Sequence, residues 1–347
     1  MTGIALTRRH RVPAWGVTLT LVLVAELLYF TLTTRHFAEG GKGMLVLTEQ
    51  FVPTGILALG AAAVILTGNI DLSAGATASL SAIVVGTELQ HGTGMGPAIF
   101  YAIGIGVAVG LFNGLVVALL GIDSLLVTLA TQFIATSLAT SIGGESPPYN
   151  FSPAFQRLGT GLVGVIPVSL LIFGVLSVVV VTVVTYTGFG RALALIGYNR
   201  SAAEYSGIRA RGVLVSVFTL SGALAGIAGV ILAAYYNSAR DDIGTTLLLP
   251  AITCVVLGGV DIFGGRGRIG EVVVAVFVLG FLTQGLLIQG RSSLTATMIT
   301  GFVLIGALII KVSVERAAGE TLLAATRRLV GQRTAARRPL RSLLDRE

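Results

Sequence analysis

Three polar side chains that could bind a solute interrupt a long apolar stretch of the chain. Asn69, Asp71 and Ser73 occur in the run Thr67-Gly-Asn-Ile-Asp-Leu-Ser-Ala-Gly75, between two apolar segments. Within a membrane, such groups are costly unless they cap a helix or line a cavity. Asp71 or Ser73 could cap the helix that follows. The run could equally be a broken helix that offers hydroxyl, amide and backbone groups to a polar solute, and the two roles are compatible.

A second polar segment, residues 187–211, is basic and contains a stretch suited to a short helix. Asn199 or Ser201 could cap a helix over residues 201–205, and Gly207 could end it. A short helix that ends at a glycine could dock a partner protein. The residues alone also fit a solvated loop.

The residue patterns that catalysis, nucleotide hydrolysis or metal binding require are not found in the sequence. The three His are scattered, so neither a metal site nor a Ser-His-Asp arrangement is predicted. Residues 265–270 fit G-x-G-x-x-G, but no βαβ unit surrounds them, and a tight turn explains them better. No P-loop sequence is present. We therefore expect no enzyme activity, no metal and no directly bound cofactor.

The composition predicts that the elements carrying these segments lie in a membrane. Hydrophobic residues make up 54% of the 347 and charged residues 11%, and the mean hydropathy is +0.90. A soluble domain carries about 25% charged residues. We expect an all-α polytopic membrane protein of about 8–10 transmembrane helices. Apolar runs place candidate spans at 13–33, 44–67, 72–89, 97–120, 124–142, 163–186, 213–236, 247–262, 269–288 and 294–311.

The net charge of +7 is concentrated in basic clusters at residues 8–11, 191–211 and 316–346. An even number of spans puts all three on the cytoplasmic side, as the positive-inside rule requires. This distribution argues against a nucleic-acid partner. We expect a cytoplasmic segment 1–12, a transmembrane domain 13–311 with a cytoplasmic loop 187–211, and a basic cytoplasmic tail 312–347 near anionic lipid. Residues 143–160 and 237–246 are then external loops.

The sequence also contains a faint internal repeat. The run Val64-Ile-Leu-Thr-Gly-Asn-Ile-Asp71 resembles Val255-Val-Leu-Gly-Gly-Val-Asp261, and Gly110-Leu-Phe-Asn-Gly114 resembles Gly280-Phe-Leu-Thr-Gln-Gly285. The two matches occur in the same order, which favours duplication over chance. Transporters often arise from such repeats, with the solute pathway at the interface between them.

Several of these motifs, in this order, resemble the membrane permeases of sugar-type ABC importers, which include ribose, xylose, rhamnose and autoinducer permeases. The resemblance covers roughly residues 45–311. It is carried by Ile65–Gly75, by Asn113-Gly-Leu-Val-Val with Leu126-Val-Thr-Leu, by Phe189–Ile208, by Ser221–Gly229, and by Val255–Gly259 with Phe263–Gly267.

The resemblance implies a permease subunit in the bacterial inner membrane, with both termini cytoplasmic, that translocates a monosaccharide or similar small polar solute. Its implied partners are cytoplasmic ABC ATPase subunits that use the ATP, an extracytoplasmic solute-binding protein, and a second permease subunit, identical or paralogous. We expect the solute pathway to include Asn69, Asp71, Ser73, Asn113 and Thr128. We expect coupling to the ATPase through Arg191, Gly197, Asn199, Ala202, Ala203, Glu204 and Gly207.

Two departures from the family pattern leave the solute open. Asn69 stands where a second Gly is common, and Asp123 where a Pro is common. The alternatives are a permease of the branched-chain amino-acid type, which looks more like Asn-Phe-Ala at the first motif, and a secondary carrier that needs no ATP.

Overall fold

The computed structural model describes residues 14–34, 37, 43–303, 305–306 and 309. The chain divides into two units, residues 1–297 and 298–347, and the elements from α1 to α13 all belong to the first. The predicted N-terminal segment 1–12 and the predicted basic tail 312–347 lie outside the described residues. So does the end of the predicted span 294–311.

The predicted all-α class is confirmed, because the described residues form helices and a single two-stranded hairpin. The elements are α1 (Ala14–Thr33), α2 (Gly43–Val46), η2 (Leu47–Gln50), α3 (Val52–Leu66), α4 (Ala74–Gln90), α5 (Met95–Leu115), η3 (Val116–Leu120), α6 (Ser124–Gly143), α7 (Pro153–Thr160), β1 (Leu162–Val163), β2 (Ile166–Pro167), α8 (Val168–Tyr186), α9 (Gly188–Tyr198), α10 (Arg200–Tyr205), α11 (Ala210–Tyr236), η4 (Thr245–Leu247), α12 (Leu248–Leu257) and α13 (Ile269–Ile288).

Within the described residues, six helices are long and apolar enough to cross a membrane: α1, α5 with η3, α6, α8, α11 and α13. A seventh is possible if the pair formed by residues 43–50 and α3, bent by 55°, counts as one span. Of the remaining predicted spans, α4 has 17 residues, α12 has 10, and the last contains the short apolar helix Ser293–Val303. The ten runs thus all contain helix, but some are too short to cross as single helices.

Helix α11 forms the centre of this part of the chain and packs against α3, α4 and α5. Of its most apolar stretch 78% is buried, against 11% for α1. Glycines allow α11 and α5 to touch at the backbone, since a Cβ on Gly222 would lie 2.1 Å from the carbonyl oxygen of Gly106. Small residues promote such close helix packing in membranes, where no hydrophobic effect drives helices together.

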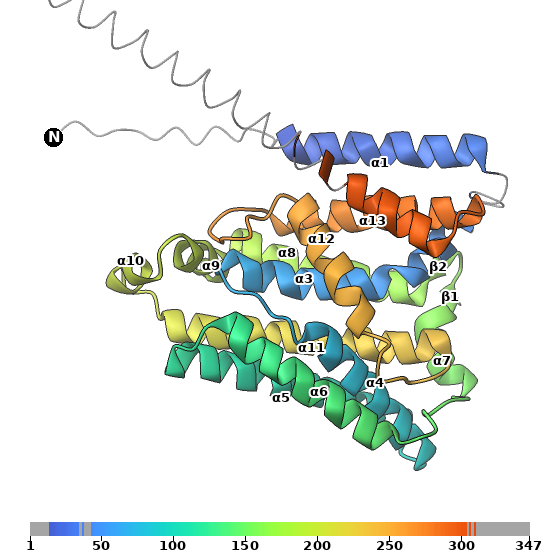
Figure 1. Ribbon diagram of the computed structural model, residues 1–347, viewed down its shortest axis with the longest axis horizontal. Helices are drawn as coiled ribbons and strands as arrows, with labels where there is room; N and C mark the ends of the chain where they lie inside the picture. The colour runs from blue at the N-terminus through green and yellow to red at the C-terminus, as the bar shows by residue number, and fades with distance from the viewer. Residues whose placement is uncertain (1–13, 35–36, 38–42, 304, 307–308, 310–347) are drawn as a thin grey trace, which may run out of the picture. The chain divides into compact units, whose positions relative to one another are not determined.

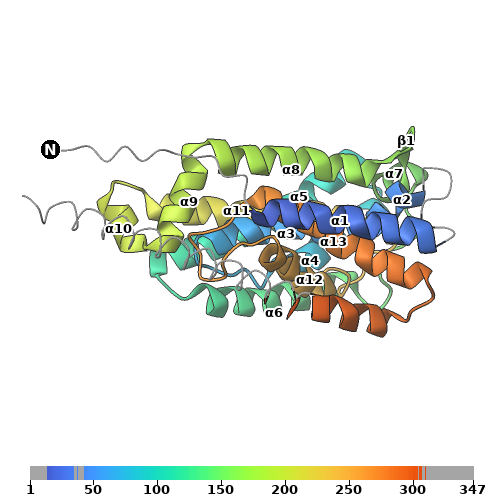
Figure 2. The ribbon, with the colours of Figure 1, turned by 90° about the horizontal axis from the view of Figure 1, so that it is seen from above.

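The helices run between two ends of the molecule that carry different elements (Figures 1 and 2). At one end lie α9 and α10; we call this the α9–α10 end. At the other lie α7 and the β1–β2 hairpin, which we call the α7 end. Helix α1 lies at the edge of the group, against α13.

Two connections differ from the prediction. The span expected at 163–186 begins only at Val168, because Leu162–Val163 and Ile166–Pro167 pair as a hairpin around Gly164, whose φ is +65°. The loop 187–211 contains two helices where one was expected. The additional helix, α9, is capped by Thr187 and buries Gly190, Ala192, Leu193 and Ile196.

Candidate functional site

The first motif is a break between α3 and α4. Helix α3 ends at Leu66, and Gly68 turns the chain with a φ of +75°, which favours glycine. The Asn69 side chain folds back over this turn, and its Nδ2 donates to the carbonyl oxygen of Thr67 at 3.2 Å and to Thr67 Oγ1 at 2.9 Å. Asn69 is partly exposed and, like its neighbour Gly68, lies at the α9–α10 end.

Beyond the turn, hydroxyl groups of α6 hold the non-helical chain. The amide of Ile70 donates to Ser124 Oγ at 3.2 Å, and the amide of Leu72 donates to Thr128 Oγ1 at 3.1 Å. Within a membrane, irregular backbone is tolerated only where such partners satisfy it. The α6 hydroxyls therefore replace the hydrogen bonds that a continuous helix would have made.

Asp71 lies at the centre of a buried hydrogen-bond network and is only 3% exposed. Its Oδ1 accepts from the amide of Ser73 at 3.0 Å and from Ser73 Oγ at 2.6 Å, and its Oδ2 accepts from Ser221 Oγ at 2.8 Å. Asn113 Nδ2 donates to Ser73 Oγ at 2.8 Å, and Asn113 Oδ1 accepts from Thr131 Oγ1 at 2.7 Å. We call Asp71, Ser73, Asn113, Thr131 and Ser221 the Asp71 network.

The network lies inside the bundle, well along α11 from its first residue. Ser221 follows Ala210, the first residue of α11, by about 16 Å at 1.5 Å per residue. Helix α4, which begins directly after Ser73, therefore starts deep within the bundle (Figure 1). Ser73 makes no capping bond with its own side chain, whereas the Asp71 carboxylate accepts an amide at this helix start.

The structure thus brings together four of the predicted pathway residues, namely Asp71, Ser73 and Asn113 in the network and Thr128 beside it, while Asn69 lies at the turn. All four are buried. The side chains of Asp71, Ser73 and Asn113 bond within the network, and Thr128 bonds backbone groups. Sequence reasoning missed Ser124, Thr131 and Ser221. The spacing of Ser124, Thr128 and Thr131 puts three hydroxyls on one face of a helix, which is a signal that could have been used.

The second motif forms a pair of helices with well-defined ends. Asn199 Oδ1 accepts from the amide of Ala202 at 2.9 Å and caps α10. At the other end, the amide of Gly207 donates to the carbonyl oxygen of Glu204 at 3.0 Å, and that of Ile208 to Ala203 at 3.1 Å. Gly207 has a φ of +84°. This is the Schellman arrangement, so the predicted cap and stop are both present.

One side of α10 packs against the bundle and the other side is exposed. Ala203 is 3% exposed and packs in an apolar cluster with Ala118, Ile196, Ala210 and Leu214. The other predicted coupling residues divide by exposure: Gly197 is half-buried, whereas Arg191, Asn199, Ala202, Glu204 and Gly207 are exposed. Ala203 is thus placed to hold the helix against the bundle.

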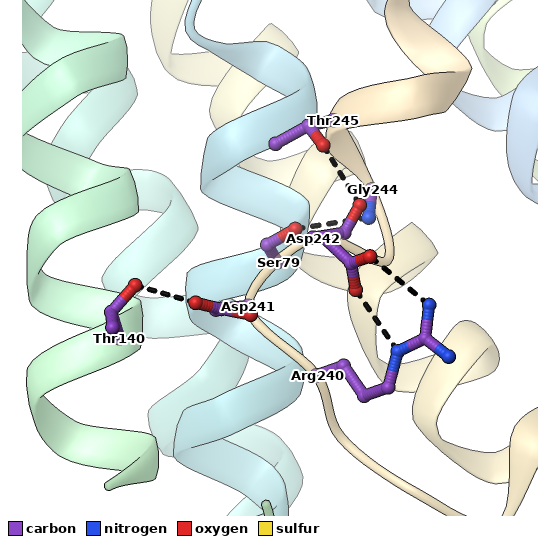
Figure 3. Close-up of polar contacts among 7 residues, drawn as sticks. All are labelled: Ser79, Thr140, Arg240, Asp241, Asp242, Gly244 and Thr245. Carbon is purple, nitrogen blue, oxygen red and sulfur yellow. Dashed lines mark hydrogen bonds and ion pairs between the residues drawn. The ribbon is translucent and has the colours of Figure 1, made fainter. Parts of the chain in front are cut away.

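At the α7 end, the connection between α11 and η4 is fastened to two helices (Figure 3). The amide of Gly244 donates to Ser79 Oγ of α4 at 2.9 Å, and Thr140 Oγ1 of α6 donates to Asp241 Oδ2 at 2.5 Å. Arg240 and Asp242 form an exposed ion pair at 2.9 Å, and its hydrogen bonds raise the pKa of the Arg240 guanidinium. This connection therefore tethers the first half of α4 to the C-terminal end of α6.

Comparison with known proteins assigns the family. Residues 43–308, more than half of the chain, match the family described as "Branched-chain amino acid transport system / permease component". The chain belongs to this family. No solved structure matches it.

Curated relatives of this permease are also similar over most of its length. It is 33% identical over 299 residues to the autoinducer 2 import system permease protein LsrD of Enterobacter sp. (strain 638), covering 84% of this chain and 90% of the relative. It is 33% identical over 306 residues to LsrD of Yersinia pseudotuberculosis serotype O:1b (strain IP 31758), covering 86% and 91%. The same identity and coverage hold for LsrD of Yersinia pestis (strain Pestoides F).

These matches confirm the resemblance to sugar-type ABC importer permeases. They do not favour the branched-chain amino-acid alternative, although the family description names that transport system. The permease is therefore a transport component that crosses the membrane several times.

Proposed function

We propose that the permease imports a monosaccharide or similar small polar solute through the inner membrane, together with a second permease subunit. Autoinducer 2 is the first solute to test, because the curated LsrD relatives are named as permeases for its import. ATP is hydrolysed by separate ATPase subunits on the cytoplasmic side. A solute-binding protein delivers the solute on the other side.

The observation that carries this proposal is the break between α3 and α4, which starts α4 deep within the bundle. Discontinuous helices of this kind form solute sites in other transporters. The proposed pathway runs along the break, with Asn69 at its α9–α10 mouth and with the Asp71 network and Thr128 supporting its wall. Because hydrogen bonds hold the segment, a second set of partners could stabilise a second arrangement and so open the pathway to the other side.

The ATPase subunits dock on the exposed side of α10. Glu204 and Ala202 are exposed there, and Tyr205 is 93% exposed. The basic residues of the loop 187–211 support a cytoplasmic position for this end. The α7 end then faces the binding protein, and the charged pair Arg240 and Asp242 lies on that exposed surface.

The test is transport by the reconstituted complex. The permease is placed in liposomes with its ATPase subunits and binding protein, and the uptake of autoinducer 2, ribose and leucine is measured with and without ATP. We expect ATP-dependent uptake of autoinducer 2 or ribose. Uptake by the permease alone under an ion gradient would instead show a secondary carrier, and uptake of leucine only would refute the proposed solute class.

A further inference from the structure

Three sequence motifs that are far apart in the chain meet at one point of the α9–α10 end. They contribute Gly197 of α9, the end of α3 at Leu66 and Gly68, and the loop after α12 at Gly264 and Gly265. The amide of Gly265 donates to the carbonyl oxygen of Leu66 at 2.9 Å, which ties the second and third segments directly. We call Gly68, Gly197, Gly264 and Gly265 the glycine joint.

Backbone touches backbone throughout the glycine joint. A Cβ atom on Gly197 would lie 2.1 Å from the carbonyl oxygen of Leu66 and 2.4 Å from the amide nitrogen of Gly265. A Cβ on Gly264 would lie 2.4 Å from the amide nitrogen of Gly68. Contacts below 3.0 Å cannot be accommodated without a shift, so a side chain at Gly197 or Gly264 would separate the three segments.

The helices α3 and α12 end in corresponding glycine turns. Gly68 follows α3 with a φ of +75°, and Gly259 follows α12 with a φ of +82°. An aspartate follows each turn and accepts the amide two residues later at 3.0 Å: Asp71 from Ser73, and Asp261 from Phe263. The two segments of the predicted repeat therefore have the same local geometry, and α9 contacts the chain after both.

The path from α9 to the buried break is short. Gly197 touches Leu66, and Asp71 follows Leu66 by five residues. The loop 187–211 that contains α9 also contains α10, whose cap Asn199 follows Gly197 by two residues. A displacement of α10 would therefore be transmitted to the α3–α4 break through the backbone contact between Gly197 and Leu66.

We propose that the glycine joint positions the two broken helices and transmits movement of α9 and α10 to the α3–α4 break and to the loop after α12. This inference rests on the proposed function, because α10 is displaced by the ATPase. Closely packed backbone has little compressible space, so a shift on one side is passed on and not absorbed. Gly197, Gly264 and Gly265 are thus positioning residues for coupling between ATP hydrolysis and transport.

The first test replaces Gly197 by alanine in the full complex, after the wild-type complex has shown solute-stimulated ATP hydrolysis. Gly197 is a helical residue without a positive φ, so the variant tests packing alone. Because coupling between sites corresponds to about 5–150-fold, we expect the ratio of stimulated to basal hydrolysis to fall at least about fivefold. The added methyl also overpacks the contact, so the melting temperature should fall, and the ratio is measured on the assembled complex below that temperature.

The matched control is Gly212→Ala. Gly212 is a helical glycine in the first turn of α11 at the same end, with nothing within 4 Å of its added Cβ. It should behave as wild type. If Gly197→Ala keeps the wild-type stimulation ratio, the proposal is wrong. A wild-type complex that does not bind an ATPase would instead refute the proposed function.

A second measurement uses the wild-type complex alone and tests the proposal even if Gly197→Ala fails to assemble. Hydrogen exchange of the wild-type complex is compared with and without ATP. We expect protection to change together in residues 188–207, 66–73 and 258–268. A change confined to residues 188–207 would overturn the proposal, because the joint would then not transmit the movement.

Discussion

Replacing Asp71 by alanine should destabilise the permease strongly. The substitution removes the acceptor of three hydrogen bonds, from the amide and hydroxyl of Ser73 and from the hydroxyl of Ser221. A buried donor left without an acceptor costs about 1–3 kcal/mol. The three together cost about 3–9 kcal/mol, a large part of the roughly 5–15 kcal/mol that stabilises a typical protein.

Two further substitutions separate geometry from charge. In Asp71→Asn, the side-chain oxygen can still accept from Ser73, and the amide can donate to Ser221 Oγ, which is able to act as an acceptor. We expect a loss below about 1 kcal/mol, since every hydrogen bond keeps a partner. Ser221→Ala removes one donor and leaves one carboxylate oxygen unpaired, so its cost should be intermediate, about 1–3 kcal/mol.

Thermal melting of the purified protein in detergent measures this order. Ser216→Ala is the control, because Ser216 lies exposed on the same helix and its hydroxyl bonds only the carbonyl oxygen of Gly212. We expect wild type, Ser216→Ala and Asp71→Asn to melt at about the same temperature. Ser221→Ala should melt at a lower temperature, and Asp71→Ala at the lowest. An unchanged melting temperature for Asp71→Ala would refute the reasoning. Equal losses for Asp71→Asn and Asp71→Ala would show that charge, and not hydrogen-bond geometry, stabilises the break.

Two further predictions concern packing and capping. Gly222→Ala should lower the melting temperature by overpacking against Gly106, at a cost of about 1–3 kcal/mol. Gly104→Ala is the control and should leave the melting temperature unchanged, because its added Cβ would have nothing within 4 Å. Asn199→Ala should weaken α10 by about 1 kcal/mol and reduce ATPase binding. Asn199→Asp keeps a side-chain oxygen that can accept the Ala202 amide, so equal losses for Asn199→Asp and Asn199→Ala would contradict a capping role.

The position of the break could be predicted because polar residues are conspicuous between apolar runs. Asn69, Asp71 and Ser73 stand out for this reason. The family resemblance indicates Asn113, which bonds Ser73. Ser221 could not be identified, since it is 150 residues away from Asp71 and only the folded chain brings the two together. A serine in an apolar helix gives no sign of which segment it will face.

The predicted length of α12 is too great for a related reason. Hydropathy counts apolar residues whether or not they are helical, so the predicted span 247–262 continues past Leu257. The extra helix α9 escapes prediction because its buried side is made of small residues such as Gly190 and Ala192 as well as Leu193 and Ile196. Such a side resembles a flexible glycine-containing connection when only the sequence is considered.

The peripheral position of α1 has a consequence for biosynthesis. Helix α1 packs chiefly against α13, and Trp15 Nε1 donates to the carbonyl oxygen of Leu257 at 2.8 Å, across 242 residues of sequence. At about 5–20 residues per second, a ribosome needs on the order of 10–50 s to make that stretch. Helix α1 therefore remains in lipid without its native neighbour until α13 has been synthesised and inserted.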